Sequence, residues 1–594
     1  MSIVFDTVIR RVYLFEEKNT MNSKFFDEKD EFESIKEFPQ NRTLYVDEFS
    51  DGGLKIYDVS KNGQDVDTES VFDYFKPAIK VQLINEDVEI FQFRTLVDFE
   101  DEQLIERSDL LKALRYKIDL CNDIIHQIEK NKALRNRLMD VDACASLKNS
   151  IASLITELSQ KKASENPIPQ EDYLILKGLI RNIEAIDPAC RAARDIFLSE
   201  SYYAGARKKL MNDLLLWASI LETGKQDLDE LVKTCIEQRN ETEYNLQSNL
   251  LQIREETKSL EVTYRTLDTF FANAGRDSTR CLTLINVSKE NLPLSNSADT
   301  LAVQNELKKH YDTLSLKNSY SLFVVPGYFG DAVVLRDWAK TAHNNKVLLI
   351  TDFMDCLNFM DLENELGKAN LQRNDLFLSN VVVTCNYLLG RKKSELANES
   401  DDVYIPGSGA LAGRMANTRE FSIAQGVVGK DYGLLNGVKG TRLKLLKAEI
   451  ANLIDEGVVP LVENEGRIYA FSNRTLYDGA SSSLQEYPIV RVLDWVNKML
   501  MNYMHEIANE TWDPYSSPTN LETKIRGFLD HYRGYQLLFS NYKLGKPIQA
   551  SDTKIVSVDI VITPYYAAKN LVIKLEADDK KHMIANTSIE EQSK

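Results

Sequence analysis

The chain has 594 residues, of which 43% are hydrophobic and 27% charged, as in ordinary globular proteins of several domains. Its net charge of −18 disfavours nucleic-acid binding and docking on an anionic membrane, because both need a positively charged surface. No hydrophobic run reaches the ~20 residues that a helix needs to cross a bilayer. The first residues lack an export signal, and the seven cysteines include no close pair of metal-ligand type. A cytoplasmic protein with reduced thiols is expected.

The first clear elements along the chain are two segments in which hydrophobic and polar residues alternate. They span residues 79–84 and 88–93, and the polar residues 85–87 separate them. Alternation with a period of two around a short polar turn predicts a β-hairpin. The preceding residues 1–65 are polar and irregular, with short strand-like pieces.

The hydrophobic spacing then changes to three and four residues, which predicts an amphipathic helix with Ser108 or Asp109 as its N-cap. The apolar stripe of this helix consists of Leu111, Leu114, Ile118, Cys121, Ile125 and Ile128. Such a stripe packs either inside its own domain or against a partner chain, and the spacing does not decide between the two.

The composition and hydrophobic pattern change three times along the rest of the chain. Residues 160–171 combine two prolines with charged and small residues and predict a linker, and residues 172–275 read as helical. From about residue 280 the pattern predicts an α/β fold, with buried strands expected at 281–287, 321–325 and 346–351 and helical stretches between them. Two further strands are expected at 555–562 and 571–575, followed by a polar tail at 577–594.

Glycine concentrates between residues 407 and 440, where eight of the 25 glycines lie. The segment 407–413 has one residue too many for a dinucleotide-binding loop, and the segment 426–431 has the wrong spacing for a phosphate-binding loop. The strand expected at 347–351 ends in Asp352, as a magnesium-binding strand does, but no phosphate loop accompanies it. Nucleotide binding is therefore not predicted.

Other catalytic patterns fail as well. The six histidines are scattered, and the nearest acid–imidazole pair, His505 and Glu506, reads as part of a surface helix. Gly407-Ser408-Gly409 is not the nucleophile elbow of a serine hydrolase. We therefore predict no catalytic, metal or cofactor site, and a protein that is not an enzyme.

Two stretches resemble the sheath proteins of type VI secretion. Residues 66–135 are similar to the small sheath subunit, TssB, in the strand entry Lys76-Pro77, the strand hairpin, the Asp98-Phe99 step and the leucine-rich helix. Residues 200–575 are similar to the large subunit, TssC. There the segment 258–267 resembles the family pattern LE-x-x-W-R-G-L, with Tyr264 and Thr266 in place of Trp and Gly.

Shorter segments of the second stretch resemble phage tail sheaths as well as TssC. Residues 405–414 are similar to the tail-sheath segment P-P-S-G-x-x-A-G, residues 474–476 to A-R-T-L, and residues 490–494 to the R-R-L entry of a helix. Residues 563–575 resemble the terminal strand pair of TssC. This mixture is typical of the divergent Bacteroidetes branch of type VI secretion.

The resemblance implies an α/β (α+β) contractile tail-sheath fold with helical segments, in which neighbouring protomers share interlaced β-strands. It divides the chain into a small-subunit-like domain at 1–160, a linker at 161–171, a helical part at 172–275, a sheath core at 276–576 and the tail at 577–594. The order points to a fusion, natural or engineered, of what are usually two chains, or to a large subunit that carries its own small-subunit-like domain. The strand residues expected to contact neighbouring subunits are Val556, Val558, Ile560, Ile562, Leu571, Ile573, Val81, Leu83 and Ile90.

The implied function is that of a structural sheath subunit in the bacterial cytoplasm, which polymerises around an inner tube and contracts to propel it. The implied partners are further copies of the sheath, an Hcp-like inner tube protein, baseplate proteins and the AAA+ unfoldase ClpV, without nucleic acid or membrane insertion. Three alternatives stay open: the tail sheath of a phage or extracellular injection system, a cytosolic nucleotide-dependent enzyme, and a coiled-coil scaffold. The last is favoured only if the helices expected at 104–128 and 226–260 are isolated from the α/β part.

Overall fold

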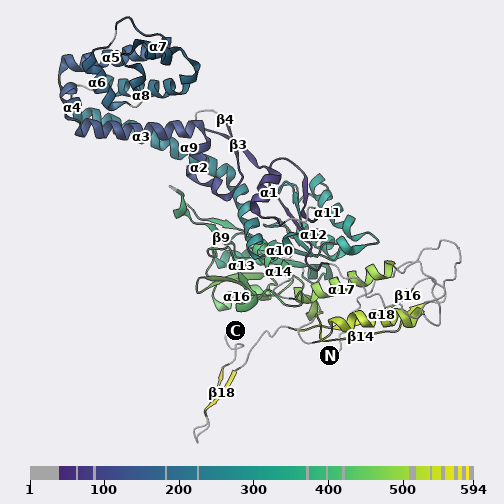
Figure 1. Cartoon of the computed structure of the whole chain (residues 1–594). Coiled ribbons are helices and arrows are strands. Elements are labelled where there is room, and N and C mark those ends of the chain that lie inside the picture. Colours follow the sequence, from purple (N-terminus) through teal and green to yellow (C-terminus); the bar gives the residue numbers. More distant parts are fainter. Residues whose placement is uncertain are drawn as a thin grey trace, which may run out of the picture. The chain divides into compact units, whose positions relative to one another are not determined.

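A computed structural model of the chain is shown in Figure 1. It describes residues 39–61, 65–84, 88–166, 168–180, 183–223, 227–369, 373–396, 399, 401–417, 422–506, 517–534, 538–549, 556–566, 573–577 and 583–587. The chain divides into two compact units. Unit 1 consists of Met1–Ile79, Gln92–Asp98 and Thr257–Lys594, and unit 2 consists of Lys80–Phe91 and Phe99–Glu256.

Unit 1 is built on a nine-stranded mixed sheet with the order β11-β13-β12-β8-β7-β6-β1-β5-β2. The central strands run parallel, and β2, β13 and β11 are antiparallel to their neighbours. The strands are β1 (Thr43–Asp47), β2 (Lys55–Asp58), β5 (Leu282–Asn286), β6 (Leu322–Val324), β7 (Leu348–Asp352), β8 (Val381–Cys385), β11 (Leu434–Leu435), β12 (Val459–Asn464) and β13 (Arg467–Ala470). The predicted α/β class and the strands β5, β6 and β7 are confirmed.

The strand β1 comes from the N-terminal part of the chain but lies between β5 and β6 in the middle of this sheet. All five of its residues are buried, because both neighbours and the layers above and below cover them. The sheet therefore unites residues 43–47 with residues after 257. The compact units thus divide the chain at other places than the expected ranges 1–160 and 172–275.

Helices pack on this sheet to form the core of unit 1 (Figure 1). Trp338, Ala339 and Ala342 of one helix contact the sheet residues Phe323 and Leu349 in the same buried cluster. The helices of unit 1 are α1 (Thr68–Phe75), the end of α9 (Leu228–Asn273), α10 (Arg276–Thr279), α11 (Ala298–Tyr311), α12 (Ala332–Asn344), α13 (Phe359–Ala369), α14 (Ser408–Ala416), α15 (Gly429–Tyr432), α16 (Lys447–Asp455), α17 (Tyr487–Glu506) and α18 (Ser517–Tyr532).

Unit 2 is helical around a separate buried cluster. Its helices are α2 (Asp101–Arg107), α3 (Asp109–Lys130), α4 (Lys132–Met139), α5 (Val141–Gln160), α6 (Gln170–Leu179), α7 (Arg191–Ser199), α8 (Ala204–Thr223) and the first part of α9. Side chains cap the starts of three of them: Ser108 accepts a hydrogen bond from the amide of Leu111, and Asn131 and Asp140 act likewise. The predicted N-cap Ser108 is confirmed.

Short strands complete the fold. The predicted hairpin is confirmed as β3 (Ala78–Gln82) and β4 (Val88–Gln92), while its turn, 85–87, lies outside the described residues. The other pairs are β9 (Leu388–Arg391) with β10 (Val403–Ile405), β14 (Asn541–Leu544) with β17 (Ile560–Thr563), β15 (Ile548–Gln549) with β16 (Val556–Ser557), and β18 (Ile573–Ala577) with β19 (Met583–Thr587). Residues 583–587, where a polar tail was expected, thus form a strand, because they pair with β18.

Two glycines explain why α14 lies very close to α9. A Cβ atom at Gly409 would lie 2.6 Å from the backbone oxygen of Thr266, and one at Gly413 would lie 2.2 Å from that of Phe270. The two glycines are four residues apart and so share one face of the helix. Glycine is needed at both positions because any larger residue would separate the two helices.

We expect Gly413→Ala to destabilise unit 1 by about 1–3 kcal/mol, because the new methyl group would collide with backbone that cannot move aside. Gly367→Ala in α13 is the matched control, since nothing lies within 4 Å of the added carbon. There alanine should stabilise by about 0.5–1 kcal/mol through its better helix propensity. Urea unfolding of both variants measures the difference, and equal effects would contradict the close packing of α14 on α9.

Candidate functional site

The predicted C-terminal contact strands are divided among small sheets. Val558 and Ile562 are buried, 5% and 8% exposed, in a cluster with α17 and α18, and Ile560 packs against the same cluster. These side chains therefore contribute to the core of their own unit. Val556 lies in β16 and Ile573 in β18, whereas Leu571 lies outside the described residues.

The hairpin of β3 and β4 places the other predicted contact residues differently. Val81 and Leu83 are buried, while Ile90 is 59% exposed. Of these three residues, Ile90 is therefore the one that a neighbouring chain can reach. None of these observations involves a second chain, so the inter-subunit role of the strands stays a prediction.

The predicted apolar stripe of α3 faces the helical core of its own unit along part of its length. Leu111, Cys121 and Ile128 are buried, and Leu114, Ile118 and Ile125 are half-buried. Cys121 and Ile128 belong to the buried cluster of unit 2, together with residues of α4, α5, α8 and α9. The alternative of packing within the own domain thus accounts for the buried part of the stripe.

The glycine-rich segment and the acid at the end of β7, which the sequence presented separately, contact each other. The Asp352 carboxylate accepts hydrogen bonds from the amides of Gly407 (2.8 Å), Ser408 (2.9 Å) and Gly327 (2.9 Å), and from the hydroxyls of Ser408 and Thr384. Burial raises the pKa of Asp352, although these hydrogen bonds oppose the rise. The N-terminus of α14, where a phosphate would bind in a nucleotide site, thus holds a carboxylate of the same chain.

We expect Asp352→Asn to destabilise the protein by about 3 kcal/mol, because an amide NH₂ cannot accept the bonds that these donors make and leaves some of them buried without a partner. Thr384→Val, which removes a single donor, should cost about 1 kcal/mol. Chemical unfolding followed by tryptophan fluorescence compares the two variants. An Asp352→Asn variant as stable as Thr384→Val would show that the carboxylate does not hold α14.

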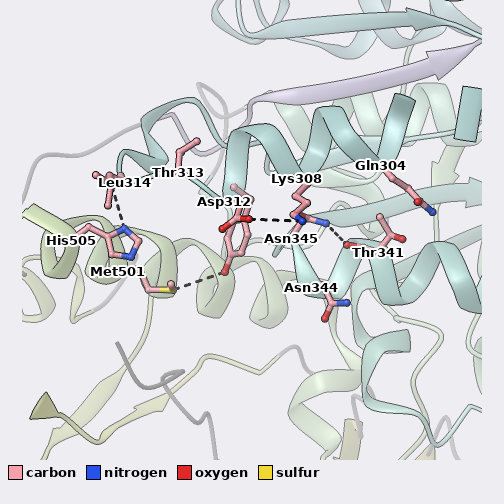
Figure 2. A pocket seen from close by; sticks show the side chains of 11 residues that line it. Gln304, Lys308, Asp312, Thr313, Leu314, Thr341, Asn344, Asn345, Met501 and His505 are labelled. Carbon is pink, nitrogen blue, oxygen red and sulfur yellow. Dashed lines mark hydrogen bonds and ion pairs between the residues drawn. The ribbon is translucent and has the colours of Figure 1, made fainter. Parts of the chain in front are cut away.

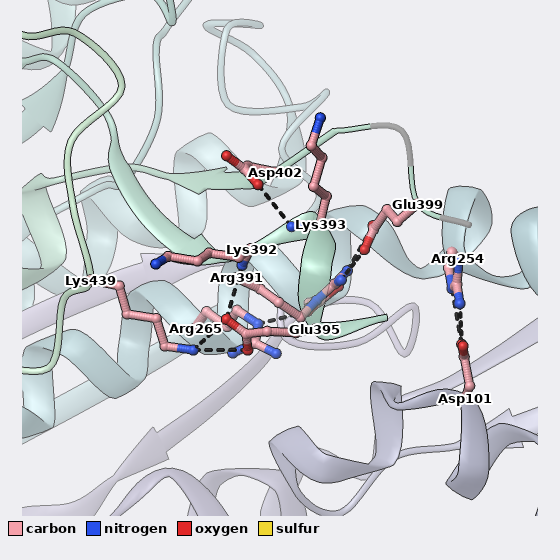
Figure 3. A network of polar contacts seen from close by, with 11 residues as sticks. Asp101, Arg254, Arg265, Arg391, Lys392, Lys393, Glu395, Glu399, Asp402 and Lys439 are labelled. Carbon is pink, nitrogen blue, oxygen red and sulfur yellow. Dashed lines mark hydrogen bonds and ion pairs between the residues drawn. The ribbon is translucent and has the colours of Figure 1, made fainter. Parts of the chain in front are cut away.

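A second buried network joins α9 to β9 (Figure 3). The guanidinium of Arg391 is 3% exposed and binds Glu261 through Nε (2.7 Å) and Nη2 (3.0 Å), and it also binds Glu399. Arg265 donates to Glu261 at 2.6 Å, and Lys439 donates to Glu395 at 2.8 Å. Burial alone would raise the pKa of Glu261, but the hydrogen bond from Arg391 and the nearby positive charges lower it below its ordinary value.

Three family models match successive parts of the chain. The N-terminal region of TssC/VipB-like proteins matches residues 148–250, the central domain of type VI secretion system TssC/VipB matches residues 252–478, and the C-terminal domain of TssC/VipB-like proteins matches residues 486–590. The chain belongs to the TssC/VipB family. This confirms the predicted membership in the type VI sheath proteins, a family of structural proteins. The small-subunit-like segment 66–135 lies outside the three matched ranges and stays a prediction.

Solved structures of contractile machines are similar to this TssC/VipB-family chain at low identity. A chain of the anti-feeding prophage baseplate has 13% identity and a TM-score of 0.40, with 54% of this chain and 81% of that chain covered. A chain of the contracted sheath of an extracellular contractile injection system has 13% identity and a TM-score of 0.39, with 54% and 80% covered. The sheath tail protein from Desulfitobacterium hafniense has 10% identity and a TM-score of 0.30, with 50% and 60% covered. A search of curated protein sequences found no match.

The structure around residues 258–267 accommodates the two residues that differ from the family pattern, Tyr264 and Thr266. Tyr264, in place of Trp, is fully buried, stacks on Phe72 with ring centroids 3.6 Å apart, and donates a hydrogen bond to the Phe49 carbonyl. Thr266, in place of Gly, is buried where α14 approaches, and its hydroxyl bonds the Val262 carbonyl. Both positions therefore still serve packing in this member of the family.

A groove of this TssC/VipB-family chain has a volume of about 700 Å³ and lies where α11, α12 and α17 end (Figure 2). Several of its polar groups bind one another or the backbone. His505 Nδ1 lies 3.2 Å from the Leu314 carbonyl oxygen, and Lys308 Nζ lies 4.0 Å from Asp312 Oδ2. The residues around it show no hydrogen bond between a nucleophile and a base, so this groove does not have the arrangement of a hydrolytic site.

The sequence did not reveal Arg391 or the bond between Asp352 and Ser408. Glu261 and Arg265 belong to the recognised family pattern, but Arg391, which binds Glu261, is 130 residues from it and lies in no motif. Among the described residues, no helix is both long and apolar enough to cross a membrane, and no group of three or more acidic, histidine or cysteine residues is arranged to hold a metal ion.

Proposed function

We propose that this chain is a structural subunit of the contractile sheath of a type VI secretion system, which polymerises helically around an inner tube and contracts to propel it. The observation that carries the proposal is the match of N-terminal, central and C-terminal TssC/VipB models in family order along residues 148–590. In this proposal contacts between subunits bring about polymerisation and contraction, and no catalytic step or cofactor is assigned to the chain. Its proposed location is the bacterial cytoplasm.

The proposed contacts between copies are shared β-strands. The C-terminal region supports this because it contains three separate two-stranded sheets, each with edge strands whose outer backbone groups face away from the partner strand. An edge of this kind can add a strand from another chain. In this proposal a neighbouring copy adds a strand beside the edge strands that contain Val556, Ile573 and Ile90.

The proposed partners follow from the family. They are further copies of this chain, an Hcp-like inner tube protein, baseplate proteins and the unfoldase ClpV. We also propose that residues 1–160 supply the part of a small sheath subunit, joined through 161–171 to the helical part at 172–275 and the core at 276–576. A chain with both parts should form tubes without a separate small subunit.

Negative-stain electron microscopy of the protein expressed alone tests this proposal. We expect hollow tubes with cogwheel cross-sections. Small uniform particles that bind ATP or GTP tightly would contradict it and favour a nucleotide-dependent enzyme. Tubes that form only when a separate small subunit is added would retain the sheath function but refute the proposed role of residues 1–160.

A further inference from the structure

Helix α17, whose residues 490–494 resemble a helix entry of tail sheaths, buries two positive charges. Arg491 and Lys498 lie two turns apart on α17 and are 6% and 1% exposed. Arg491 Nη1 donates to the Met415 carbonyl at 3.1 Å, and Lys498 Nζ donates to the Tyr320 carbonyl at 2.7 Å. Both cations thus bind neutral carbonyl groups.

No carboxylate in the described part of the chain forms an ion pair with either cation. Asp494, which lies between them on α17, is engaged elsewhere: its Oδ2 accepts a hydrogen bond from Asn380 at 2.6 Å, and its Oδ1 lies 3.9 Å from Lys346 Nζ. Together these four charged side chains carry three positive charges and one negative charge. Burial of uncompensated charge is costly, so the site is suited to one further negative charge.

A small cavity lies beside these charges. It is lined by Gln40, Ser321, Leu348, Arg491, Asp494, Trp495 and Lys498. Nη2 of Arg491 is buried and has no hydrogen-bond partner among the described residues. The cavity offers about 10 Å³ to the centre of a water-sized group, which is about the space of one such group. Four side chains that line the cavity can each donate a hydrogen bond to a group bound inside it: Arg491, Lys498, Ser321 and Gln40.

We propose that this cavity binds a single small inorganic anion of the size of chloride, held by Arg491 and Lys498. A phosphate or an organic carboxylate is too large for a space of one water-sized group. The position gives the anion a structural effect, because Arg491 joins α17 to α14 through the Met415 carbonyl, and Lys498 joins α17 to the Tyr320 carbonyl, two residues before β6. Burial also lowers the pKa of Lys498 to about 8, as expected for an amine without a carboxylate partner. The proposal does not depend on the sheath function.

The test compares thermal unfolding of the full chain in sodium chloride and in sodium gluconate at equal ionic strength, since gluconate is too large to enter. We expect chloride to raise Tm in a saturable way, by at least about 2 °C more than gluconate, because a ligand that binds only the folded state stabilises it. Chlorine NMR should show line broadening by the wild-type protein. Equal effects of the two salts would overturn the proposal and indicate a water molecule in the cavity.

Variants locate the effect. In Arg491→Met and Lys498→Met the additional shift in chloride should disappear, and Arg491→Lys, which keeps the charge but loses Nη2, should require at least about fivefold more chloride. Arg474→Met is the matched control, because Arg474 is also buried in unit 1 but binds Gln485 and Asp478; its response to chloride should be unchanged. A full chloride response in both Arg491→Lys and Lys498→Met would place the anion elsewhere and refute this site.

Discussion

Removal of residues 567–594 is expected to abolish assembly into tubes while the protomer stays folded. The deleted segment contains β18 and β19, which pair with each other in a two-stranded sheet. An isolated two-stranded sheet is marginally stable in water, so this sheet gains most from a further strand of a neighbouring copy. The deletion spares Tyr565 and Tyr566, whose hydroxyl groups bind the Gly534 carbonyl and the Ser483 hydroxyl.

A longer deletion, of residues 555–594, provides the contrast. It also removes Val558 and Ile562, whose burial next to α17 and α18 contributes about 1.5–3 kcal/mol for each side chain. The longer deletion should therefore lower the stability of unit 1 as well as abolish assembly. Electron microscopy and sedimentation measure assembly, and circular dichroism and urea unfolding measure the fold. Intact tubes from the shorter deletion would refute the role of β18 and β19 in strand exchange.

The elements that could be predicted from the sequence are those whose signal is local. The hairpin of β3 and β4 follows from alternation in residues 79–84 and 88–93, and the start of α3 follows from Ser108 and the spacing after it. The strands β5, β6 and β7 follow from short apolar runs. In each case the residues that decide the structure are close in sequence, so a single sequence contains the information.

The arrangements that could not be predicted join distant residues. The strand β1 is a five-residue piece whose neighbours β5 and β6 come more than 200 residues later. Asp352 and Ser408 were both noticed, as a failed magnesium site and a failed glycine loop, but their hydrogen bond spans 56 residues. Many acids are available to bind any buried donor, and only the fold selects one. The functional family was recognised because its motifs are local, whereas the partners of those motifs are not.

Arg391→Met is expected to destabilise unit 1 strongly. Methionine is close in volume to the aliphatic part of arginine, so the variant mainly removes charge and hydrogen bonds. Among the described residues, it leaves the Glu261 carboxylate, which is 6% exposed, with Arg265 as its remaining ion-pair partner, and it removes the guanidinium that pairs with Glu399. Removal of one partner from a buried ion pair costs about 3–5 kcal/mol. Arg265→Met should cost less, because Arg265 is 16% exposed and makes a single bond to Glu261.

The pH dependence of these variants separates a lost charge from a lost packing contact. In the wild type the pKa of Glu261 lies below the ordinary value of 4.5, so its contribution is present above that pH and is lost as pH falls through the lowered pKa. In Arg391→Met, burial without the guanidinium should raise the pKa of Glu261 above 4.5. As pH falls, Glu261 should then become protonated in the folded state at a higher pH than in the unfolded state. The deficit relative to wild type should then be largest at pH 7 and shrink toward pH 4. Urea unfolding at both pH values measures it, and a deficit independent of pH would mean that Arg391 acts through packing alone.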